Sequence, residues 1–416
     1  MRIGLIGHNS VEYIEKLLEI WNSGNSTVLI DYDTPAAVIQ HILEECNAKH
    51  CYIEKSLCSL CENLTSIEVT LYSVNYKMPC LLPRSIRDTY KSRYDESEAI
   101  VINSSGTTGK CKCISLSHRA IHNNADSIID YMKPSKNDCF IMNKKLIYSS
   151  SFTGELLVAL KSGADLLLSP VVIPPRLAFQ NILNYHVSIL CCNPALISMY
   201  VAEAERTGVF PRSVKVVYSS GDMISAKEIE KARDTFGCPV YNVYGQTECG
   251  PRISAQTEEF CHGNSVGKPI KNVKVQINSN AEILVKTNAF FSEYIGTPKT
   301  QAEWHRTGDL GFIADNGELY VTGRVDNMLV VGAHNIYPET IERVIIDNTD
   351  VFDCIVYKKD GRLVCDCVAS QDTMSQIIRS VNMFLMPYEV PKSFYLVESI
   401  TRNKNGKKIR GNGGNC

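Results

Sequence analysis

The sequence predicts an α/β fold in two domains: a large N-terminal domain of parallel-rich sheets covered by helices, and a small mobile α+β C-terminal domain. Three observations support this prediction. Strand-like and helix-like segments alternate through residues 1–60, the alternation returns in the middle of the chain, and the composition changes after Arg324. A chain of 416 residues is long enough for two hydrophobic cores. We therefore expect a large domain at 1–325 and a small domain at 326–416.

The first sixty residues contain three expected strands with a helix after each of the first two. RIGLIG is typical of a strand, and Ser10 is placed to cap a helix whose apolar side chains recur at helical spacing up to Trp21. Gly24 ends this helix, and TVLI follows as a strand. Thr34 and Pro35 are expected to supply a cap and a first-turn proline for the second helix, before the strand CYIE.

The middle of the chain repeats this alternation. LLLS, SILCC and VKVVYSSG are apolar runs that end in small residues, and PALISMYVAEAERTG and SAKEIEKARDTFG are amphipathic helices between strands. VYNVYGQTE is a further strand that leads into a loop. Small polar residues beyond the ends of parallel strands are where open α/β sheets bind ligands. We therefore expect the site along this edge.

The segment after Arg324 has the pattern of a separate small unit. Residues 341–347 continue a helix, and DCIVYKKDGRLVCDCVA predicts a hairpin that turns at Asp360 and Gly361. MSQIIRSVNMFL follows as a helix and SFYLVES as a last strand. A unit of this size is typical of a domain.

Composition excludes several classes of function. The net charge of −2 does not indicate binding to nucleic acid or to a membrane surface. No apolar run is long enough for membrane insertion. The N-terminus lacks the pattern of a signal peptide, and the 17 cysteines are scattered, so we expect reduced thiols in a cytoplasmic protein. One cluster, His50, Cys51, Cys58 and Cys61, lacks the second close pair of a structural zinc site. Its cysteines are therefore interpreted as ordinary thiols.

Residues 102–120, INSSGTTGKCKCISLSHRA, raise the question of phosphate binding. A Walker loop requires G-x-x-x-x-G-K-[ST], but Cys111 follows Gly109–Lys110 and Ser104 stands where the first glycine would be. What remains is a loop of hydroxyls and glycines whose backbone N–H groups suit a polyphosphate that Lys112 would neutralise. Taken alone, the stretch fits a flexible turn equally well.

Four later stretches favour the phosphate interpretation. Residues 241–250 read YNVYGQTECG, 304–310 read WHRTGDL, 323–342 read GRVDNMLVVGAHNIYPETIE, and 400–410 read ITRNKNGKKIR. In this order, and with residues 102–120 similar to T-S-G-T-T-G-x-P-K-G, they resemble the adenylate-forming superfamily. That superfamily contains acyl-CoA synthetases, adenylation domains of peptide synthetases, and luciferases. The resemblance covers almost the whole chain and is closest to a compact, stand-alone acyl- or aryl-CoA ligase.

The resemblance implies ATP-dependent activation of a carboxylate with Mg²⁺, a reaction that needs positioned charge around in-line phosphates more than proton transfer. Each motif then implies a part of the nucleotide site. The residues implied to bind the β- and γ-phosphates are Ser105, Gly106, Thr107, Thr108, Gly109 and Lys112. Those implied to contact the adenine are Asn242, Tyr244 and the adjoining Gly245. Thr247 is implied to contact the α-phosphate, Glu248 to bind Mg²⁺, Asp309 to bind the ribose, and Arg324 to contact the ribose or a phosphate.

In that superfamily the C-terminal domain rotates between two half-reactions. Two further residues match positions that take part in this rotation. Asp326 matches the hinge between the domains. Lys407 matches the lysine that reaches the reacting carboxylate and phosphate oxygens, where its charge would stabilise the developing negative charge. The alternative to a catalytic role for NKNGKKIR is a solvated basic turn, and Lys408 fits this alternative better than Lys407 does.

Departures from the family pattern bear on the substrate. Cys111 and Cys113 replace the usual Pro and Gly of the phosphate loop. Thr153 stands where peptide synthetases carry an Asp that binds an α-ammonium group, and a buried ammonium without such a partner is costly, so an α-amino acid is disfavoured. Ser151 stands where acyl-CoA synthetases often carry a His. The candidates for the acyl pocket are Phe152, Thr153, Ser219, Ser220 and Gly221, with strand-end packing as the alternative.

We therefore expect an AMP-forming acid–thiol ligase that makes an acyl adenylate from a small carboxylic acid and transfers the acyl group to CoA or to a phosphopantetheinyl carrier protein. Ala333 replaces a glycine beside the expected thiol tunnel, which leaves free CoA and a carrier-protein arm both open. The alternatives are a stand-alone amino-acid adenylation enzyme, acyl transfer to an amine, and a non-catalytic nucleotide-binding protein. Against the last, Glu248, Asp309 and Lys407 are all retained.

Overall fold

Five strands at the N-terminus form the parallel part of a seven-stranded sheet. This computed structural model describes residues 1–105, 111–171, 173–297, 303–331, 334–370, 373–402 and 408–410. Strands β1, β2, β3, β4 and β6 run parallel, and β7 and β17 join antiparallel at one edge. The strand order is β17 (Glu293–Tyr294), β7 (Cys111–Ser117), β6 (Glu98–Ser105), β2 (Ser26–Ile30), β1 (Arg2–Ile6), β3 (His50–Glu54), β4 (Glu68–Tyr72).

A second sheet of eight strands is also parallel at its centre, as the alternation of apolar runs and helices predicts. Its parallel pairs are β9 with β8, β8 with β10, β10 with β11 and β11 with β12. The strand order is β14 (Lys268–Pro269), β13 (Ser254–Ala255), β12 (Val240–Tyr244), β11 (Val216–Ser219), β10 (Ile189–Cys192), β8 (Cys139–Met142), β9 (Asp165–Leu168), β5 (Cys80–Leu81).

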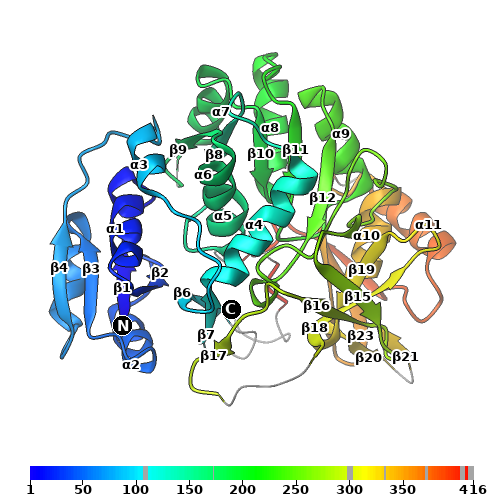
Figure 1. Cartoon of the computed structure of the whole chain (residues 1–416). Coiled ribbons are helices and arrows are strands. Elements are labelled where there is room, and N and C mark those ends of the chain that lie inside the picture. Colours follow the sequence, from blue (N-terminus) through cyan, green and yellow to red (C-terminus); the bar gives the residue numbers. More distant parts are fainter. Residues whose placement is uncertain are drawn as a thin grey trace.

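Helices cover both faces of these sheets (Figure 1). The central layer lies between the two sheets, where one hydrophobic cluster joins Leu5 and Ile100 of the first sheet to Phe140 and Leu166 of the second. The helices of the large part are α1 (Val11–Asn22), α2 (Ala36–Glu45), η1 (Lys55–Asn63), α3 (Arg84–Thr89), α4 (His118–Met132), α5 (Ser149–Ser151), η2 (Phe152–Leu157), α6 (Val158–Ser162), α7 (Pro175–Asn184), α8 (Pro194–Thr207), α9 (Ala226–Phe236) and η3 (Thr247–Cys249).

Helix starts follow local sequence signals in most cases. The Ser10 hydroxyl accepts from the Tyr13 N–H at the start of α1, and Ser225 forms a reciprocal capping box with Glu228 at the start of α9. The expectation for α2 is wrong in detail. Pro35 has an extended ψ of 140° and occupies the N-cap position with no side-chain cap, so the helix begins one residue later than Thr34 and Pro35 suggested.

Apart from β17, the strands after β14 form smaller sheets. The four-stranded antiparallel sheet ends at Arg324, and the sequence analysis did not identify it. The hairpin that was predicted at Asp360 and Gly361 is present, with φ of 49° and 76°, the positive values that a tight two-residue turn requires. The remaining elements are β15 (Val273–Ile277), β16 (Glu282–Thr287), β18 (His305–Ile313), β19 (Leu319–Arg324), η4 (Val325–Asn327), β20 (Leu329–Val331), β21 (His334–Ile336), α10 (Pro338–Asn348), β22 (Asp353–Lys359), β23 (Arg362–Val368), α11 (Met374–Phe384) and β24 (Ser393–Leu396).

Contacts at the start of α9 place α10 and the residues just after it beside the second sheet. The Ala226 N–H donates to Asp347 at 3.2 Å, and the Lys227 ammonium lies 3.1 Å from Asp350. The last described residues return to α10, where the Arg410 guanidinium pairs with Glu342 at 2.5 Å. The domain boundary at residues 325 and 326 stays a prediction, and it falls inside η4.

Candidate active site

Strands β6 and β7 carry the predicted phosphate loop at their connection. They pair antiparallel in a register that sets Ser105 opposite Cys111. Gly106, Thr107, Thr108 and Gly109, to which the resemblance assigns the phosphates, lie outside the described residues, so their role stays a prediction. Lys112 on β7 places its ammonium 5.3 Å from the centre of the Tyr294 ring.

The loop after β12 contains the predicted adenine and α-phosphate residues. Gly245 has no room for a side chain, because a Cβ there would lie 1.7 Å from the Pro251 carbonyl oxygen. Thr247 follows at the start of η3, and its hydroxyl lies 2.9 Å from that of Ser149 on α5. The close approach of two backbones therefore fixes the path of the loop, and Ser149 holds the Thr247 hydroxyl at its end.

Glu248 is the carboxylate that the resemblance assigns to Mg²⁺. Its Oε1 accepts a hydrogen bond from the Tyr294 hydroxyl at 2.9 Å. Burial, and then the nearby Glu248 charge, raise the pKa of Tyr294, so this tyrosine stays a neutral donor at physiological pH. Carboxylate oxygens are the ligands that Mg²⁺ prefers, so Glu248 fits the ion chemically.

Asp309 is the centre of a hydrogen-bond network that joins three segments. Its Oδ2 accepts from the Tyr244 hydroxyl and from Gln246 Nε2, both at 2.6 Å, and its Oδ1 pairs with Arg324 Nη1 at 2.6 Å. Burial, and then the Asp309 charge, raise the pKa of Tyr244, which remains protonated as a donor. The sequence analysis identified Tyr244, Asp309 and Arg324 separately but missed Gln246, whose contact with β18 only the fold reveals.

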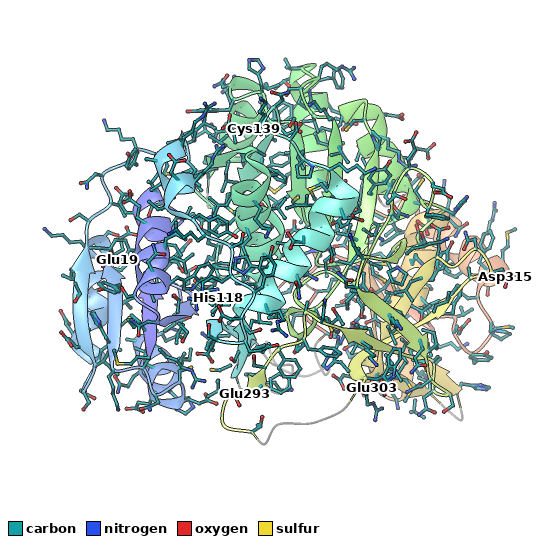
Figure 2. The ribbon with its side chains drawn as sticks, viewed as in Figure 1. Glu19, His118, Cys139, Glu293, Glu303 and Asp315 are labelled. Carbon is teal, nitrogen blue, oxygen red and sulfur yellow. The ribbon has the colours of Figure 1, made fainter. Side chains whose placement is uncertain are left out.

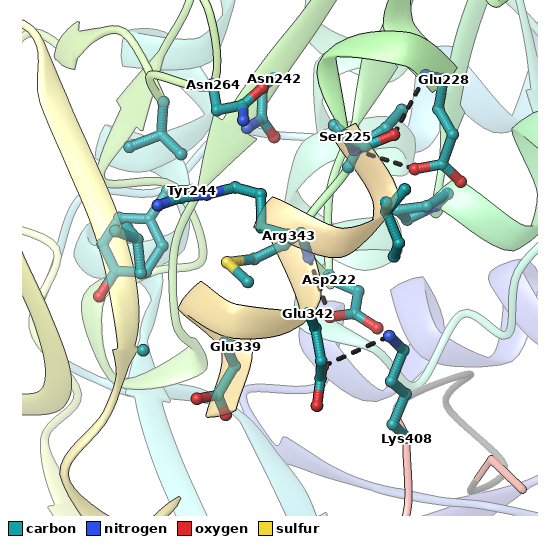
Figure 3. A pocket seen from close by; sticks show the side chains of 18 of the residues that line it. Asp222, Ser225, Glu228, Asn242, Tyr244, Asn264, Glu339, Glu342, Arg343 and Lys408 are labelled. Atoms are coloured by element: carbon teal, nitrogen blue, oxygen red, sulfur yellow. Dashed lines mark hydrogen bonds and ion pairs between the residues drawn. The ribbon is translucent and has the colours of Figure 1, made fainter. Parts of the chain in front are cut away.

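These residues line one pocket of about 570 Å³ (Figure 3). Asn242 is 5% exposed and donates through Nδ2 to the Ser265 carbonyl at 3.3 Å. In Figure 3, Asn242 lies at the top and Tyr244 at the left, and Glu339 and Glu342 of α10 lie below them. From the predicted set, the pocket is lined by Gly221, Asn242, Tyr244, Gly245, Asp309 and Arg324. The structure thus brings the expected nucleoside residues together in a space of ligand size.

The C-terminal unit contributes basic and acidic groups to the same pocket. Lys408 lies 2.9 Å from Asp353 and 3.4 Å from Glu342, and it donates to the Cys354 carbonyl at 2.6 Å. These contacts give Lys408 a structural role. Lys407, the predicted catalytic lysine, lies outside the described residues. Asp326, the predicted hinge, is exposed on η4 with its Oδ2 3.7 Å from Arg324 Nη2.

The candidates for the acyl pocket occupy two places. Phe152 and Thr153 are fully buried on η2, and the Phe152 ring packs edge-on against Trp21 at 5.8 Å. Ser219 is also fully buried, at the end of β11, and its hydroxyl has no hydrogen-bond partner. Ser220 is 7% exposed, and only Gly221 of the five reaches the pocket wall. The acyl-pocket role of these residues on η2 and at the end of β11 stays a prediction.

Comparison with known proteins decides the family. The family model described as AMP-binding enzyme matches residues 1–294, which is more than half of the chain. The chain belongs to this family.

Curated relatives match most of the length of this AMP-binding enzyme. It is 23% identical to a fatty acid–[acyl-carrier-protein] ligase, ScoC of Streptomyces coeruleorubidus, over 98% of this chain and 85% of that one. It is 28% identical to a 2-succinylbenzoate–CoA ligase of Bacillus cytotoxicus, over 74% of this chain and 68% of that one. An AMP-forming ligase of acyl or aryl acids is therefore the class of enzyme to which it is related.

Solved structures share the fold of the AMP-binding enzyme. The anthranilate CoA ligase AuaEII in complex with anthranoyl-AMP has a TM-score of 0.85 at 19% identity, covering 98% of this chain and 85% of that one. The O-succinylbenzoate coenzyme A synthetase of Bacillus subtilis in complex with ATP and magnesium has a TM-score of 0.81 at 20% identity, covering 98% and 88%. The predicted fold class is confirmed by these similarities.

Two other expectations concern metals and membranes. Within the described parts of the chain, no three His, Cys, Asp or Glu side chains are grouped to hold a metal ion, and His50 Nε2 lies 2.9 Å from the Thr70 hydroxyl. Among the helices that the structure describes, none is long and apolar enough to cross a bilayer.

Proposed function

We propose that this enzyme uses ATP and Mg²⁺ to activate a small carboxylic acid as an acyl adenylate and then transfers the acyl group to a thiol. The observation that carries the proposal is the network around Asp309, which holds Tyr244, Gln246 and Arg324 at the wall of one pocket. A carboxylate with two acceptor oxygens suits the two hydroxyls of a ribose, and an aromatic ring beside it suits adenine. Thr247 and Glu248 directly follow Gln246 in the chain. There they would bind the α-phosphate and Mg²⁺.

The first half-reaction joins the acid to AMP. A carboxylate oxygen attacks the α-phosphorus of ATP, a new P–O bond forms, and the bond to the β-phosphate oxygen breaks to release pyrophosphate. The charge that develops on the phosphate oxygens requires fixed donors and cations. The residues proposed for this task are Thr247, Lys112 and Lys407, with Mg²⁺ held by Glu248.

The second half-reaction moves the acyl group to sulfur. A thiolate attacks the carbonyl carbon of the acyl adenylate, the C–O bond to AMP breaks, AMP leaves, and the thiol proton passes to solvent. The names of the relatives support two acceptors, since one is a CoA ligase and another acts on acyl carrier protein. We propose CoA or the phosphopantetheine arm of a carrier protein as the acceptor.

A thioester assay tests this function directly. The enzyme is incubated with MgATP, a panel of fatty, aryl, hydroxy and amino acids, and either CoA or a pantetheinylated carrier protein, and thioesters are detected by mass spectrometry. We expect an acid-dependent thioester with one of the two thiols, together with AMP in equal amount. An amide in place of a thioester when an amine is added would favour the alternative acceptor. Exclusive activation of amino acids would favour a stand-alone amino-acid adenylation enzyme, which Thr153 argues against.

A further inference from the structure

A buried arginine directly behind the Thr247 loop has no carboxylate partner. Arg252 is 2% exposed, and its Nε has no hydrogen-bond partner. Among the residues that the structure describes, no Asp or Glu forms an ion pair with its guanidinium. Burying a charge without a counter-ion is costly, because the lost hydration is not replaced. Such an arginine indicates that an anion belongs beside it.

The guanidinium points toward η2. A Cβ placed on Gly154 of this helix would lie 3.3 Å from Arg252 Nη2, so the absence of a side chain at Gly154 leaves room for the guanidinium. The Tyr131 hydroxyl lies near the same guanidinium. Burial raises the pKa of Tyr131 and the Arg252 charge opposes that shift, so a neutral donor stands next to the guanidinium. Arg252 therefore reaches from the Thr247 loop to the helix of the predicted acyl pocket.

A nearby carboxylate, Glu155, is already paired with a lysine. Glu155 on η2 is fully buried, and its Oε1 lies 2.7 Å from the Lys144 ammonium. Burial raises the pKa of Glu155, while the charges of Lys144 and Arg252 oppose this shift. With Lys144 and Arg252 cationic and Glu155 as the one carboxylate, the cluster keeps at least one positive charge without a counter-ion. We call these three residues the buried charge cluster.

The helix that carries Glu155 has unusual geometry and unsatisfied polar atoms. Residues Phe152–Leu157 form a π-helix, a conformation that often occurs at functional sites. The hydroxyls of Ser151 and Thr153, the Arg252 Nε and the Glu155 Oε2 are buried without hydrogen-bond partners. Each such group weakens folding unless a ligand pairs with it. Unpartnered donors together with excess positive charge favour a polar, anionic ligand over an apolar one.

The buried charge cluster adjoins the reaction site. Ile253, next to Arg252, donates its N–H to the Tyr244 carbonyl at 2.8 Å, and the Arg252 Cα would lie 2.9 Å from a Cβ on Gly245. Ser149, at the other end of the α5–η2 segment, contacts Thr247. The remote end of an acid whose reacting carboxylate lies at Thr247 would therefore lie near Arg252 and η2.

We propose that the acid substrate is a dicarboxylic acid, whose second carboxylate, remote from the one that is adenylated, pairs with Arg252. This proposal rests on the proposed function and assigns its substrate class. The planar guanidinium accepts a carboxylate in a bidentate arrangement, which gives direction as well as attraction. Lys144 and Glu155 form an ion pair with each other near this guanidinium. Monocarboxylic acids of equal length leave Arg252 without its counter-ion.

The first test compares matched acids on the wild-type enzyme. Acid-dependent ATP–pyrophosphate exchange is measured for linear and aromatic dicarboxylic acids of four to eight carbons, each beside its monocarboxylic counterpart. We expect kcat/KM for the best dicarboxylic acid to exceed that of its counterpart by at least about 10-fold. A preference for monocarboxylic acids would overturn the assignment and leave the proposed function intact. Exchange with neither set would count against both.

Variants then locate the effect at Arg252. Arg252→Met is expected to lower kcat/KM for the dicarboxylic acid by about 10²-fold, mainly through KM, and that for the monocarboxylic acid by less than about 3-fold. Arg252→Lys should restore part of the preference, because it keeps the charge but not the bidentate geometry. Arg206→Met, which removes an exposed arginine of α8, is the matched control and should change neither value. Equal losses for both acids in a folded Arg252→Met variant would show a structural role and contradict the proposal.

Discussion

The Tyr244 hydroxyl donates to the Asp309 carboxylate at 2.6 Å, and this hydrogen bond joins β12 of the second large sheet to β18 of the four-stranded sheet. The two residues are 65 positions apart. The bond fixes the carboxylate and orients the tyrosine ring at the wall of the pocket. The nucleoside site is thus built across two sheets.

Removing this bond should weaken ATP binding. Tyr244→Phe keeps the ring but leaves Asp309 with Gln246 and Arg324 alone, so we expect KM for ATP to rise by about 10-fold, in line with roughly 1.5 kcal/mol for a hydrogen bond to a charged group. The measurement is ATP–pyrophosphate exchange against ATP concentration. Tyr357→Phe removes a comparable tyrosine–carboxylate bond, to Asp366, at a distance from the pocket and serves as control. An unchanged KM in Tyr244→Phe would remove Asp309 from the nucleotide site.

Glu248 should control the dependence on magnesium. Glu248→Gln removes the negative charge that attracts the ion but keeps an oxygen that can accept from Tyr294. We expect the Mg²⁺ concentration for half-maximal exchange to rise by about 10-fold or more. Glu303→Gln, at an exposed glutamate, is the control and should leave the magnesium dependence unchanged. Equal magnesium curves for Glu248→Gln and the wild-type enzyme would contradict the assignment.

Two buried histidines should make the fold sensitive to acid. His118 lies at the start of α4 in the interior, edge-on to Trp21 at 4.8 Å (Figure 2). Burial, and then the charge of Arg93, lower the pKa of His118 to about 4, and burial lowers that of His122 to about 4. A lowered folded-state pKa means that the unfolded state takes up protons first. The stabilisation is therefore complete above the ordinary value of 6.5 and is lost as the pH falls toward 4.

A substitution at His118 isolates this effect. His118→Phe keeps an aromatic ring against Trp21 and removes a group whose two ring nitrogens have no hydrogen-bond partner. We expect the fall in unfolding temperature between pH 7 and pH 4.5 to be smaller in His118→Phe than in the wild-type enzyme. Substituting the exposed His186 by Phe is the control. The same pH profile for His118→Phe and wild type would show that His118 does not titrate in this range.

The predicted catalytic lysine gives a further test. Lys407→Ala should reduce acid-dependent exchange by about 10²-fold or more, because a cation at the reacting oxygens is lost. Lys231→Ala, which removes an exposed lysine of α9, should leave exchange unchanged. Lys408→Ala should lower the unfolding temperature, since Lys408 holds Asp353 and Glu342. Full exchange in Lys407→Ala would reject its assigned role.

Local signals in the sequence predicted much of the fold. Ser10, and Asp360 with Gly361, act within a few residues, so a helix cap and a tight turn are readable without the structure. Pro35 shows the limit of such signals, since its backbone angle moved the start of α2 by one residue. Element type is thus more predictable than element boundary.

The site was predictable as separate motifs but not as a network. The contacts of Gln246 with Asp309, of Ser149 with Thr247 and of Tyr294 with Glu248 each join segments at least 46 residues apart. The lack of a carboxylate partner at Arg252 depends on what the fold brings near it. No pattern in the sequence contains that information.

Acid-dependent ATP–pyrophosphate exchange tests the central claim most directly. Purified enzyme, MgATP and labelled pyrophosphate are combined with each carboxylic acid of the panel in turn, without any thiol. The account predicts label in ATP only when a suitable acid is present, because reversal of adenylation requires the acyl adenylate. Exchange that no acid raises above the blank would contradict it.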